Sequence, residues 1–262
     1  MKKLSVALLS LLLMFALVGC SAKENSESEM TALDKALITS NKIIIGTSPD
    51  YPPFESLSAQ GELEGFEIDM IKDVIDLLNT QQSSNYEIEF KQMDFSNIIT
   101  ALQMGQVDIG LSGFTYNPER DCIFATPHLL SKQVIVVAAD SEIKQASDLV
   151  GKKCAAGLGT TGAEALGAII GEENIQYPGD YTFMFEALGA GQLDAVICDE
   201  AVGDNYVAAK GFVKLEEALV NEDMSIIIKT GNTVLADAIN QAVEAYMQTD
   251  AYKALLDKWG LG

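Results

Sequence analysis

The chain has 262 residues, of which 48% are hydrophobic, 21% charged and 7% aromatic, which is enough apolar material for one large or two modest cores. Its 38 acidic residues against 17 basic ones give a formal net charge of -21, so nucleic acid and anionic lipid surfaces are excluded as partners. The four cysteines form no C-x-x-C pair and accompany a single histidine, which predicts neither a metal site nor a disulfide framework.

The first nineteen residues have the features of a signal peptide. Two lysines precede an apolar run, Leu4 to Val18, which is too short for a stable membrane-spanning helix. The run leads into Leu17-Val18-Gly19-Cys20, which resembles the lipobox of bacterial lipoproteins, where the cysteine becomes the lipidated first residue of the mature chain. We therefore expect residues 1–19 to be removed, and lipidated Cys20 and the polar residues that follow it to form a flexible tether over 20–40.

Strand and helix patterns alternate from Lys42 onward, which predicts an α/β fold with largely parallel sheets. The expected strands cover 42–47, 86–90, 107–111, 133–138, 152–156 and 194–198. The expected helices cover 65–78, 96–104, 161–170, 181–190 and 234–247, with a short one around Leu33 and Leu37.

An eight-residue segment occurs twice: Ala101-Leu102-Gln103-Met104-Gly105-Gln106-Val107-Asp108 returns 86 residues later (101 to 187) as Ala187-Leu188-Gly189-Ala190-Gly191-Gln192-Leu193-Asp194. Each copy ends a helix on glycine and begins an apolar strand. We interpret the two copies as one small α/β lobe present twice, against chance similarity of a common helix-to-strand link. Ligands of open α/β sheets bind beyond the carboxyl ends of the strands, so Ser112-Gly113 and Asp199-Glu200 are candidates to face each other across a cleft.

Two segments predict binding of a small anion. Gly157-Leu158-Gly159-Thr160-Thr161-Gly162 has the G-x-G-x-x-G spacing of a dinucleotide site, but the acidic residue that such a site needs is poorly placed, because Asp180 follows a Pro-Gly turn. We therefore expect the helix start to bind a small anion, for which a carboxylate serves as well as a phosphate. Arg120 could bind a carboxylate through two parallel hydrogen bonds, or pair at the surface with a neighbouring acid.

Tyr51, in Tyr51-Pro52-Pro53-Phe54, could offer its ring as a wall at a strand's carboxyl edge, with Phe54 filling the core.

A serine hydrolase is disfavoured. Gly110-Leu111-Ser112-Gly113-Phe114 lacks the last glycine of a nucleophile elbow, and nothing ties His128 to the serine. We expect His128 to be a solvated or hydrogen-bonded structural residue. The pair Asp199-Glu200 could in principle perform acid–base chemistry.

Together these motifs resemble the amino-acid branch of the solute-binding proteins that serve ABC importers. The motifs that carry the resemblance run in order from about Lys42 to the end of the chain: Gly46-Thr47, Tyr51-Pro52-Pro53-Phe54-Glu55, Gly65-Phe66-Glu67-Ile68-Asp69, Met93-Asp94-Phe95-Ser96, Ala101-Leu102-Gln103, Pro118-Glu119-Arg120, Asp148-Leu149-Val150-Gly151-Lys152, Gly159-Thr160-Thr161-Gly162, Asp194-Ala195-Val196 with Asp199-Glu200, and Lys258-Trp259-Gly260.

The resemblance implies the fold: an α/β, two-lobed type II periplasmic-binding-protein clamshell in which each lobe is a mostly parallel sheet flanked by helices. Lobe 1 would comprise residues 41–131 plus 224–262, and lobe 2 residues 132–223. The chain would cross between the lobes near 131–133 and 223–225.

The resemblance also implies the site. Arg120 would hold a ligand α-carboxylate with the backbone N–H groups of Thr115 and Thr161. The Asp199 carboxylate, the Gly113 carbonyl and the Thr115 hydroxyl would meet the α-ammonium group, and Tyr51 and Phe95 would enclose the side chain. The expected ligand-binding residues are Tyr51, Phe95, Ser112, Gly113, Thr115, Arg120, Thr160, Thr161 and Asp199.

The implied function is an extracytoplasmic, lipid-anchored binding protein, not an enzyme, that needs no cofactor and delivers a free amino acid to ABC permease and ATPase subunits. We expect a monomer that touches the membrane through its N-terminal lipid only. Ser48, Gly157 and Cys198 replace charged or polar residues of relatives with cationic or amide ligands, which predicts an uncharged ligand side chain. The alternative is a clamshell enzyme such as a cyclohexadienyl dehydratase, with Glu200 in its acid–base pair.

Departures from the family pattern fall next to the first crossover. The stretch from Arg120 to Phe124 is two residues shorter than usual, and Thr126 and His128 replace an aspartate and a tyrosine. We therefore expect the hinge to differ in detail from that of relatives.

Overall fold

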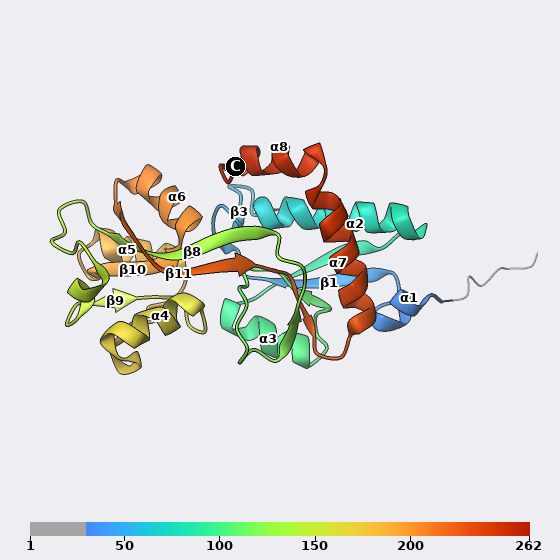
Figure 1. Cartoon of the computed structure of the whole chain (residues 1–262), viewed down its shortest axis with the longest axis horizontal. Helices are drawn as coiled ribbons and strands as arrows, with labels where there is room; N and C mark the ends of the chain where they lie inside the picture. The colour runs from blue at the N-terminus through green and yellow to red at the C-terminus, as the bar shows by residue number, and fades with distance from the viewer. Residues whose placement is uncertain (1–29) are drawn as a thin grey trace, which may run out of the picture.

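The computed structural model describes residues 30–262. The predicted signal peptide and Cys20 lie outside the described residues. Figure 1 draws residues 1–29 as a grey trace. Two bodies lie side by side along the long axis, joined by a pair of long strands (Figure 1). We call the body around the five-stranded sheet lobe 1 and the body around the four-stranded sheet lobe 2. No helix within residues 30–262 is long and apolar enough to cross a membrane.

The sheet of lobe 1 has the strand order β5-β1-β6-β12-β7. Its strands are β1 (Lys42–Thr47), β5 (Glu87–Gln92), β6 (Ile109–Gly110), β7 (Cys122–Phe124) and β12 (Ile227–Lys229). A separate three-stranded sheet consists of β2 (Asp50–Tyr51), β3 (Glu55–Leu57) and β4 (Leu63–Glu64). The helices of this lobe are α1 (Ala32–Ala36), α2 (Phe66–Gln82), α3 (Phe95–Gln103), α7 (Thr233–Met247) and α8 (Asp250–Trp259).

The sheet of lobe 2 has the order β11-β8-β10-β9. Its strands are β8 (Leu129–Val137), β9 (Cys154–Ala155), β10 (Ala195–Asp199) and β11 (Val213–Met224). Its helices are α4 (Thr161–Ile170), α5 (Tyr181–Gly189) and α6 (Glu200–Lys210), with short 3-10 turns η1 (Ala146–Leu149) and η2 (Glu172–Asn174).

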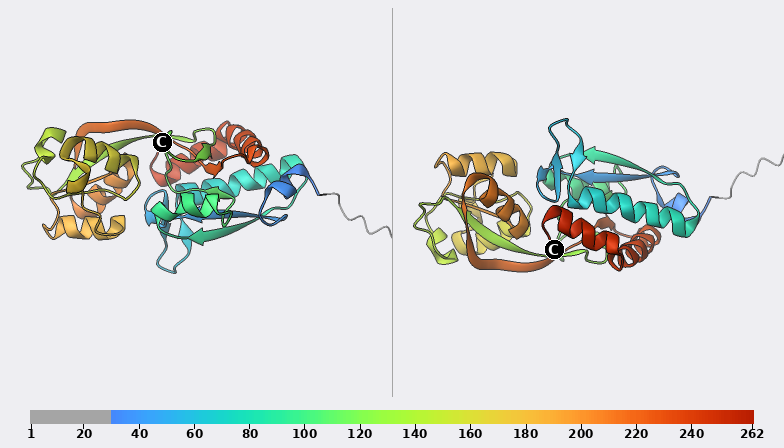
Figure 2. Two further views of the ribbon diagram at one scale, coloured as in Figure 1. Left: turned by 90° about the horizontal axis from the view of Figure 1, so that it is seen from below. Right: turned by 90° about the horizontal axis from the view of Figure 1, so that it is seen from above.

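The sheets are mixed rather than mostly parallel. β1 is parallel to β5 and β6, and β9 to β10, whereas β12 is antiparallel to its neighbours and β8 is antiparallel to β10 and β11. The reason is the path of the chain. It leaves lobe 1 along β8 and returns along β11, and these crossing strands pair side by side in opposite directions (Figure 2).

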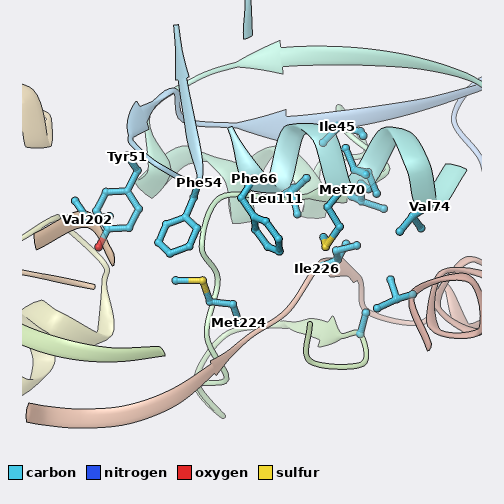
Figure 3. Packing of buried hydrophobic residues seen from close by; sticks show 14 of the residues in the cluster. Ile45, Tyr51, Phe54, Phe66, Met70, Val74, Leu111, Val202, Met224 and Ile226 are labelled. Carbon is cyan, nitrogen blue, oxygen red and sulfur yellow. The ribbon is translucent and has the colours of Figure 1, made fainter. Parts of the chain in front are cut away.

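Helix α2 shows how sequence periodicity builds the core of lobe 1. One face of the helix is apolar and buried, and its residues recur every three or four positions: Phe66, Met70, Ile71, Val74, Ile75 and Leu78. Figure 3 shows this face packed toward residues of β1, of the segment after β6 and of the return from β11. Cys122, Cys154 and Cys198 are free thiols, as the sequence predicts.

The repeated eight-residue segment makes the same hydrogen bonds in both lobes. The fifth residue of each copy, a glycine, has φ of +67° in the first and +68° in the second, the left-handed conformation that ends a helix. Asp108 donates its N–H to the carbonyl of Ile44 (2.7 Å) and accepts the N–H of that residue on its carboxylate (2.8 Å). Asp194 exchanges the same two bonds with Lys153, both at 2.8 Å. The repeated segment therefore forms the same helix-to-strand link in both lobes, and the duplication of a whole lobe stays a prediction.

Candidate functional site

A cavity of about 300 Å³ lies between the two lobes, beyond the carboxyl ends of β1, β6 and β10. Its walls come from the loops after these strands and from the first turns of helices α3, α4 and α5. The lining residues are Ser48, Asp50, Tyr51, Asp94, Phe95, Ser96, Ser112, Gly113, Thr115, Arg120, Gln133, Gly157, Leu158, Thr160, Thr161, Tyr177, Gly179, Asp180, Tyr181, Met184 and Asp199. All nine residues expected at the site are among them.

Arg120 lies at one end of this cavity. Its Nη1 donates to the carbonyl of Thr115 at 2.7 Å in lobe 1, and its Nη2 donates to the carbonyl of Gly159 at 2.9 Å in lobe 2. The guanidinium carbon lies 5.7 Å and 5.4 Å from the ring centres of Phe95 and Phe114. Burial lowers the pKa of Arg120, but arginine keeps its charge in proteins. Among the ion pairs of residues 30–262 none involves Arg120, so surface pairing with a neighbouring acid is not seen.

Helix α4 begins beside Arg120. The Thr160 side chain caps the helix by accepting the N–H of Ala163 at 3.1 Å, and the helix starts at Thr161. The first N–H groups of a helix have no partner inside it and favour an anion. A Cβ at Gly162 would lie 2.4 Å from Oε1 of Gln133, so the last glycine of the motif permits close approach of α4 to a crossing strand. Arginine and helix start together make this end of the cavity an anion site.

Asp199 lies across the cavity, at the end of β10, and is buried. Its carboxylate accepts hydrogen bonds from the hydroxyl of Tyr51 (2.7 Å), the hydroxyl of Ser131 (2.5 Å) and the side-chain amide of Gln133 (3.0 Å). Burial, with the charge of Glu222, raises the pKa of Asp199 to about 7 despite these bonds. The carboxylate therefore titrates near neutral pH and favours a cation that replaces its lost hydration.

The aromatic residues Tyr51 and Phe95 both line the cavity, as expected. The hydroxyl of Tyr51 also accepts the backbone N–H of Asp199 at 2.8 Å, and its ring lies 4.5 Å from that of Tyr181 in the opposite lobe. Phe95 stacks on Phe114, with ring centres 4.6 Å apart. Tyr181 follows a Pro-Gly-Asp turn directly, and sequence reasoning placed it only in a helix.

Ser131 and Gln133 are further site residues that the sequence analysis did not identify. Both lie on β8, and both donate to the Asp199 carboxylate. Residues two apart on a strand point to the same face, so the expected crossover at 131–133 contained a signal for this pair. The sequence did not show that these two side chains face Asp199, because this depends on how β8 pairs with β10.

Three more acids line the cavity. Asp50 accepts the Ser48 hydroxyl (2.7 Å) and, across the lobes, the N–H of Tyr181 (3.1 Å). Burial raises the pKa of Asp50, and the nearby charge of Asp180 adds to this rise. Asp94 lies at the start of α3. The described lining residues thus include four carboxyl groups and a single cation, Arg120.

Glu200 points away from this cavity. Its Oε1 pairs with Lys132 (2.8 Å) and Lys214 (2.7 Å), and it lines a separate groove next to the C-terminal residues. Burial would raise the pKa of Glu200, but the bonds from the two lysines outweigh it and the pKa lies below the usual range. An acid–base pair of Asp199 with Glu200 is therefore not assembled at the cavity. Within the described residues, no three His, Cys, Asp or Glu side chains could hold a metal ion together.

Comparison with known proteins gives one family. The sequence model of the bacterial extracellular solute-binding proteins, family 3, matches residues 43–262. The arginine-binding extracellular protein ArtP of Bacillus subtilis is 30% identical, over 100% of this chain and 99% of its own length. The glutamine-binding protein GlnH of the same organism is 28% identical, over 99% and 97%. Both relatives are amino-acid-binding proteins, and GlnH is the binding protein of an ABC transporter.

Solved structures of amino-acid-binding proteins are similar to this chain. An ancestral arginine-binding protein bound to glutamine is 31% identical with a TM-score of 0.78, over 85% of this chain and 99% of that one. The ancestral amino acid-binding protein AncCDT-1, described as a precursor of cyclohexadienyl dehydratase, is 29% identical with a TM-score of 0.74, over 84% and 95%. The expected two-lobed α/β clamshell is confirmed by this likeness, with mixed sheets.

Proposed function

The chain belongs to family 3 of the bacterial extracellular solute-binding proteins, and from this premise we propose that it is the amino-acid-binding subunit of an ABC importer. One observation carries the proposal: an arginine with a helix start and a buried carboxylate line the same cavity. A carboxylate alone satisfies only the first site and a cation only the second. A free amino acid, which carries both charges on adjacent groups, satisfies both.

Each expected residue takes a role in this proposal. Arg120 and the N–H groups of Thr115 and Thr161 hold the α-carboxylate; a guanidinium has five donors, so its two bonds to carbonyls leave others free. Asp199 holds the α-ammonium group together with the carbonyl of Gly113 and the hydroxyl of Thr115.

Tyr51 and Phe95 enclose the ligand side chain. Ser112 and Thr160 shape the two loops that carry the polar contacts: Ser112 accepts the N–H of Ser48 at 3.1 Å, and Thr160 donates to the carbonyl of Gly157 at 2.8 Å.

Ligand capture and lobe closure are one process in this proposal. Each charge site is built from both lobes. Arg120 belongs to lobe 1 and the start of α4 to lobe 2, while Asp199 belongs to lobe 2 and Gly113 to lobe 1. The ligand therefore makes its full set of contacts only when the lobes meet. A ligand shifts a conformational equilibrium by its difference in affinity for the two states. Here the difference in affinity is large, because nearly all contacts of the ligand form only in the closed state.

The proposal includes the organisation of the whole chain. Lobe 1 comprises 41–131 plus 224–262 and lobe 2 comprises 132–223, which is supported by the membership of the two sheets. Removal of residues 1–19 and lipidation of Cys20 would hold a monomer at the outer side of the membrane, where permease and ATPase subunits take over the ligand. The lipobox-like sequence supports this part of the proposal.

The class of ligand side chain has two candidates. The uncharged side chain expected from Ser48, Gly157 and Cys198 stays a prediction. A cationic side chain is the second candidate, favoured by the carboxyl groups of Asp50 and Asp180 in the cavity wall. A thermal-shift panel of the twenty amino acids plus cystine separates them, because a ligand that binds only the native state raises its melting temperature.

Titration calorimetry with Arg120→Ala and Asp199→Ala tests the proposal. Each variant should weaken binding by roughly a hundredfold or more, because a ligand charge is left unpaired in a closing cavity. Lys253→Ala and Asp250→Ala, which remove an exposed ion pair on α8, are the matched controls and should bind as the wild type does. Unchanged affinity in either cavity variant overturns the site, and a wild type that no amino acid stabilises overturns the function.

A further inference from the structure

Three ionisable side chains that amino-acid binding does not use lie together inside lobe 1. Glu55 and Glu67 are fully buried, and His128 is 1% exposed. They come from β3, from the first turn of α2 and from the residue before β8. Burial of such groups is costly unless they are hydrogen-bonded. Their hydrogen-bond partners therefore show which parts of the chain the three side chains hold in place.

The carboxylate of Glu67 makes one bond with each of its two oxygens. Oε2 accepts the backbone N–H of Gly113 at 2.7 Å, and Oε1 lies 2.8 Å from Nε2 of His128. Gly113 lines the ligand cavity in a left-handed conformation, with φ of +58°. A single side chain thus connects the loop of the proposed ammonium site with His128.

His128 lies where both crossing strands enter lobe 1. Its backbone N–H donates to the carbonyl of Met224, the last residue of β11, at 2.9 Å. Its own carbonyl accepts the hydroxyl of Tyr252 from α8 at 2.5 Å. The backbone of His128 is therefore held to the returning strand and to a helix of lobe 1, while its ring reaches Glu67.

Glu55 supports the neighbouring residue of the same loop. Its Oε1 accepts the hydroxyl of Ser112 at 3.0 Å. Burial, with the neighbouring Glu67 carboxyl, raises the pKa of Glu55 well above its usual range. Ser112 and Gly113 are thus each held by one buried glutamate side chain.

We propose that Glu67 is a positioning residue that fixes Gly113 to the base of the crossing strands through His128, and so couples ligand contact at Gly113 to the hinge. The proposal rests on the proposed function for the ligand at Gly113. The alternative is that Glu67 only stabilises lobe 1. The two differ in a testable way: coupling requires a change at His128 to reach Gly113, whereas a purely stabilising role does not.

Amide hydrogen exchange of the ligand-free protein tests the coupling, read at Gly113. His128→Phe keeps a ring but removes the nitrogen that bonds Glu67, so the Gly113 amide should exchange at least tenfold faster. His128→Gln keeps an N–H donor and should restore slow exchange. Asp69→Asn is the matched control, since Asp69 lies in the same helix turn but bonds Lys258 and Trp259 instead.

The ligand part is tested by calorimetry with L-arginine, L-glutamine, L-histidine and L-cystine as probes. Glu67→Gln cannot accept from both Gly113 and His128, so it should bind the best probe roughly tenfold more weakly, while Asp69→Asn binds normally. Unchanged Gly113 exchange in His128→Phe overturns the coupling. Faster exchange with unchanged affinity in Glu67→Gln overturns positioning. A wild type that none of the twenty amino acids or cystine stabilises instead overturns the proposed function, and the exchange result still decides the link to His128.

Discussion

Asp199 shows how burial converts an ordinary carboxyl group into a selective cation site. Its three hydrogen bonds stabilise the ionised form, yet burial and the charge of Glu222 outweigh them. A bound cation therefore stabilises the ionised form of Asp199 strongly, because no cation in the described part of the chain forms an ion pair with this carboxylate. An α-ammonium group is such a cation, and its binding should draw a proton off Asp199.

This coupling predicts a pH dependence of affinity. With a pKa of about 7 in the free protein, Asp199 is increasingly protonated as the pH falls below 7, and an ammonium ligand must displace that proton. The dissociation constant should therefore rise by up to about tenfold per pH unit below pH 7 and level off above pH 8. Calorimetry at pH 5.5 in two buffers of different ionisation enthalpy should detect the released proton. Asp199→Asn should bind weakly with a flat profile, and a flat wild-type profile would contradict the prediction.

The sequence located the cavity residues better than it located their partners. All nine expected residues line the cavity. The pattern of strand ends and helix starts pointed to some of them, such as Asp199, and the family resemblance supplied others, such as Phe95 and Thr115. Gln133, Tyr181 and Asp50 were missed as site residues, although each contacts a residue far away in the chain. Contacts between neighbouring strands and between the lobes depend on the tertiary arrangement, and no local pattern encodes that arrangement.

Among the elements, those with a strong apolar stripe were predictable and those without were not. Helix α4 occupies its expected range, and α2 exceeds its expected range at the C-terminal end. Helices α6 and α8 were not predicted; α8 buries Leu255 alone, which leaves no periodic signal to read. Strand β11 is rich in acidic residues and mostly exposed or half-buried, so the alternation that identifies a strand is weak there.

The repeated helix-to-strand link gives a stability prediction with its own control. Asp108 is 3% exposed, and its carboxylate accepts the N–H groups of Ile38 and Ile44, each at 2.8 Å. Asp194 accepts one N–H at a more exposed position. Asp108→Ala should lower the free energy of unfolding by about 2–3 kcal/mol and Asp194→Ala by about 1 kcal/mol, since buried N–H groups without an acceptor cost most. Urea unfolding measures both, and equal losses would show that burial does not set the difference.

At the scale of the whole molecule, closure brings like charges together as well as opposite ones. Asp50 belongs to lobe 1 and Asp180 to lobe 2, and the charge of Asp180 contributes to the raised pKa of Asp50. A cation between them would relieve the repulsion, whereas an uncharged side chain would leave it. The charge of the ligand side chain that binds best therefore depends on how close Asp50 and Asp180 come in the closed state.

Asp180→Asn distinguishes the two classes. Asparagine keeps the cap of α5, which Asp180 supplies by accepting the N–H of Phe183 at 2.7 Å, so the fold is preserved. A ligand with an uncharged side chain should bind roughly threefold more tightly to the variant, because closure meets less repulsion. L-arginine should bind roughly threefold more weakly. Calorimetry with L-arginine and L-glutamine measures both, and a change of the same sign for the two ligands would contradict the argument.

Closure is also stabilised outside the cavity. The side-chain amide of Asn117 in lobe 1 donates to Oε1 of Glu164 in lobe 2 at 2.7 Å, and neither residue lines the cavity. A bond that exists only when the lobes meet contributes to ligand affinity without touching the ligand, because it lowers the free energy of the closed state.

Glu164→Ala should therefore weaken amino-acid binding by roughly three- to tenfold, about the net value of one hydrogen bond of ordinary strength. Glu164→Gln is the matched control. It keeps the oxygen that accepts from Asn117 but removes the charge that Arg120 feels, so the difference between the two variants isolates the bond. Small-angle scattering of the ligand-free alanine variant should show a larger radius of gyration than that of the glutamine variant. If both variants lose affinity equally, the charge near Arg120 is responsible and the bond between the lobes contributes nothing to closure.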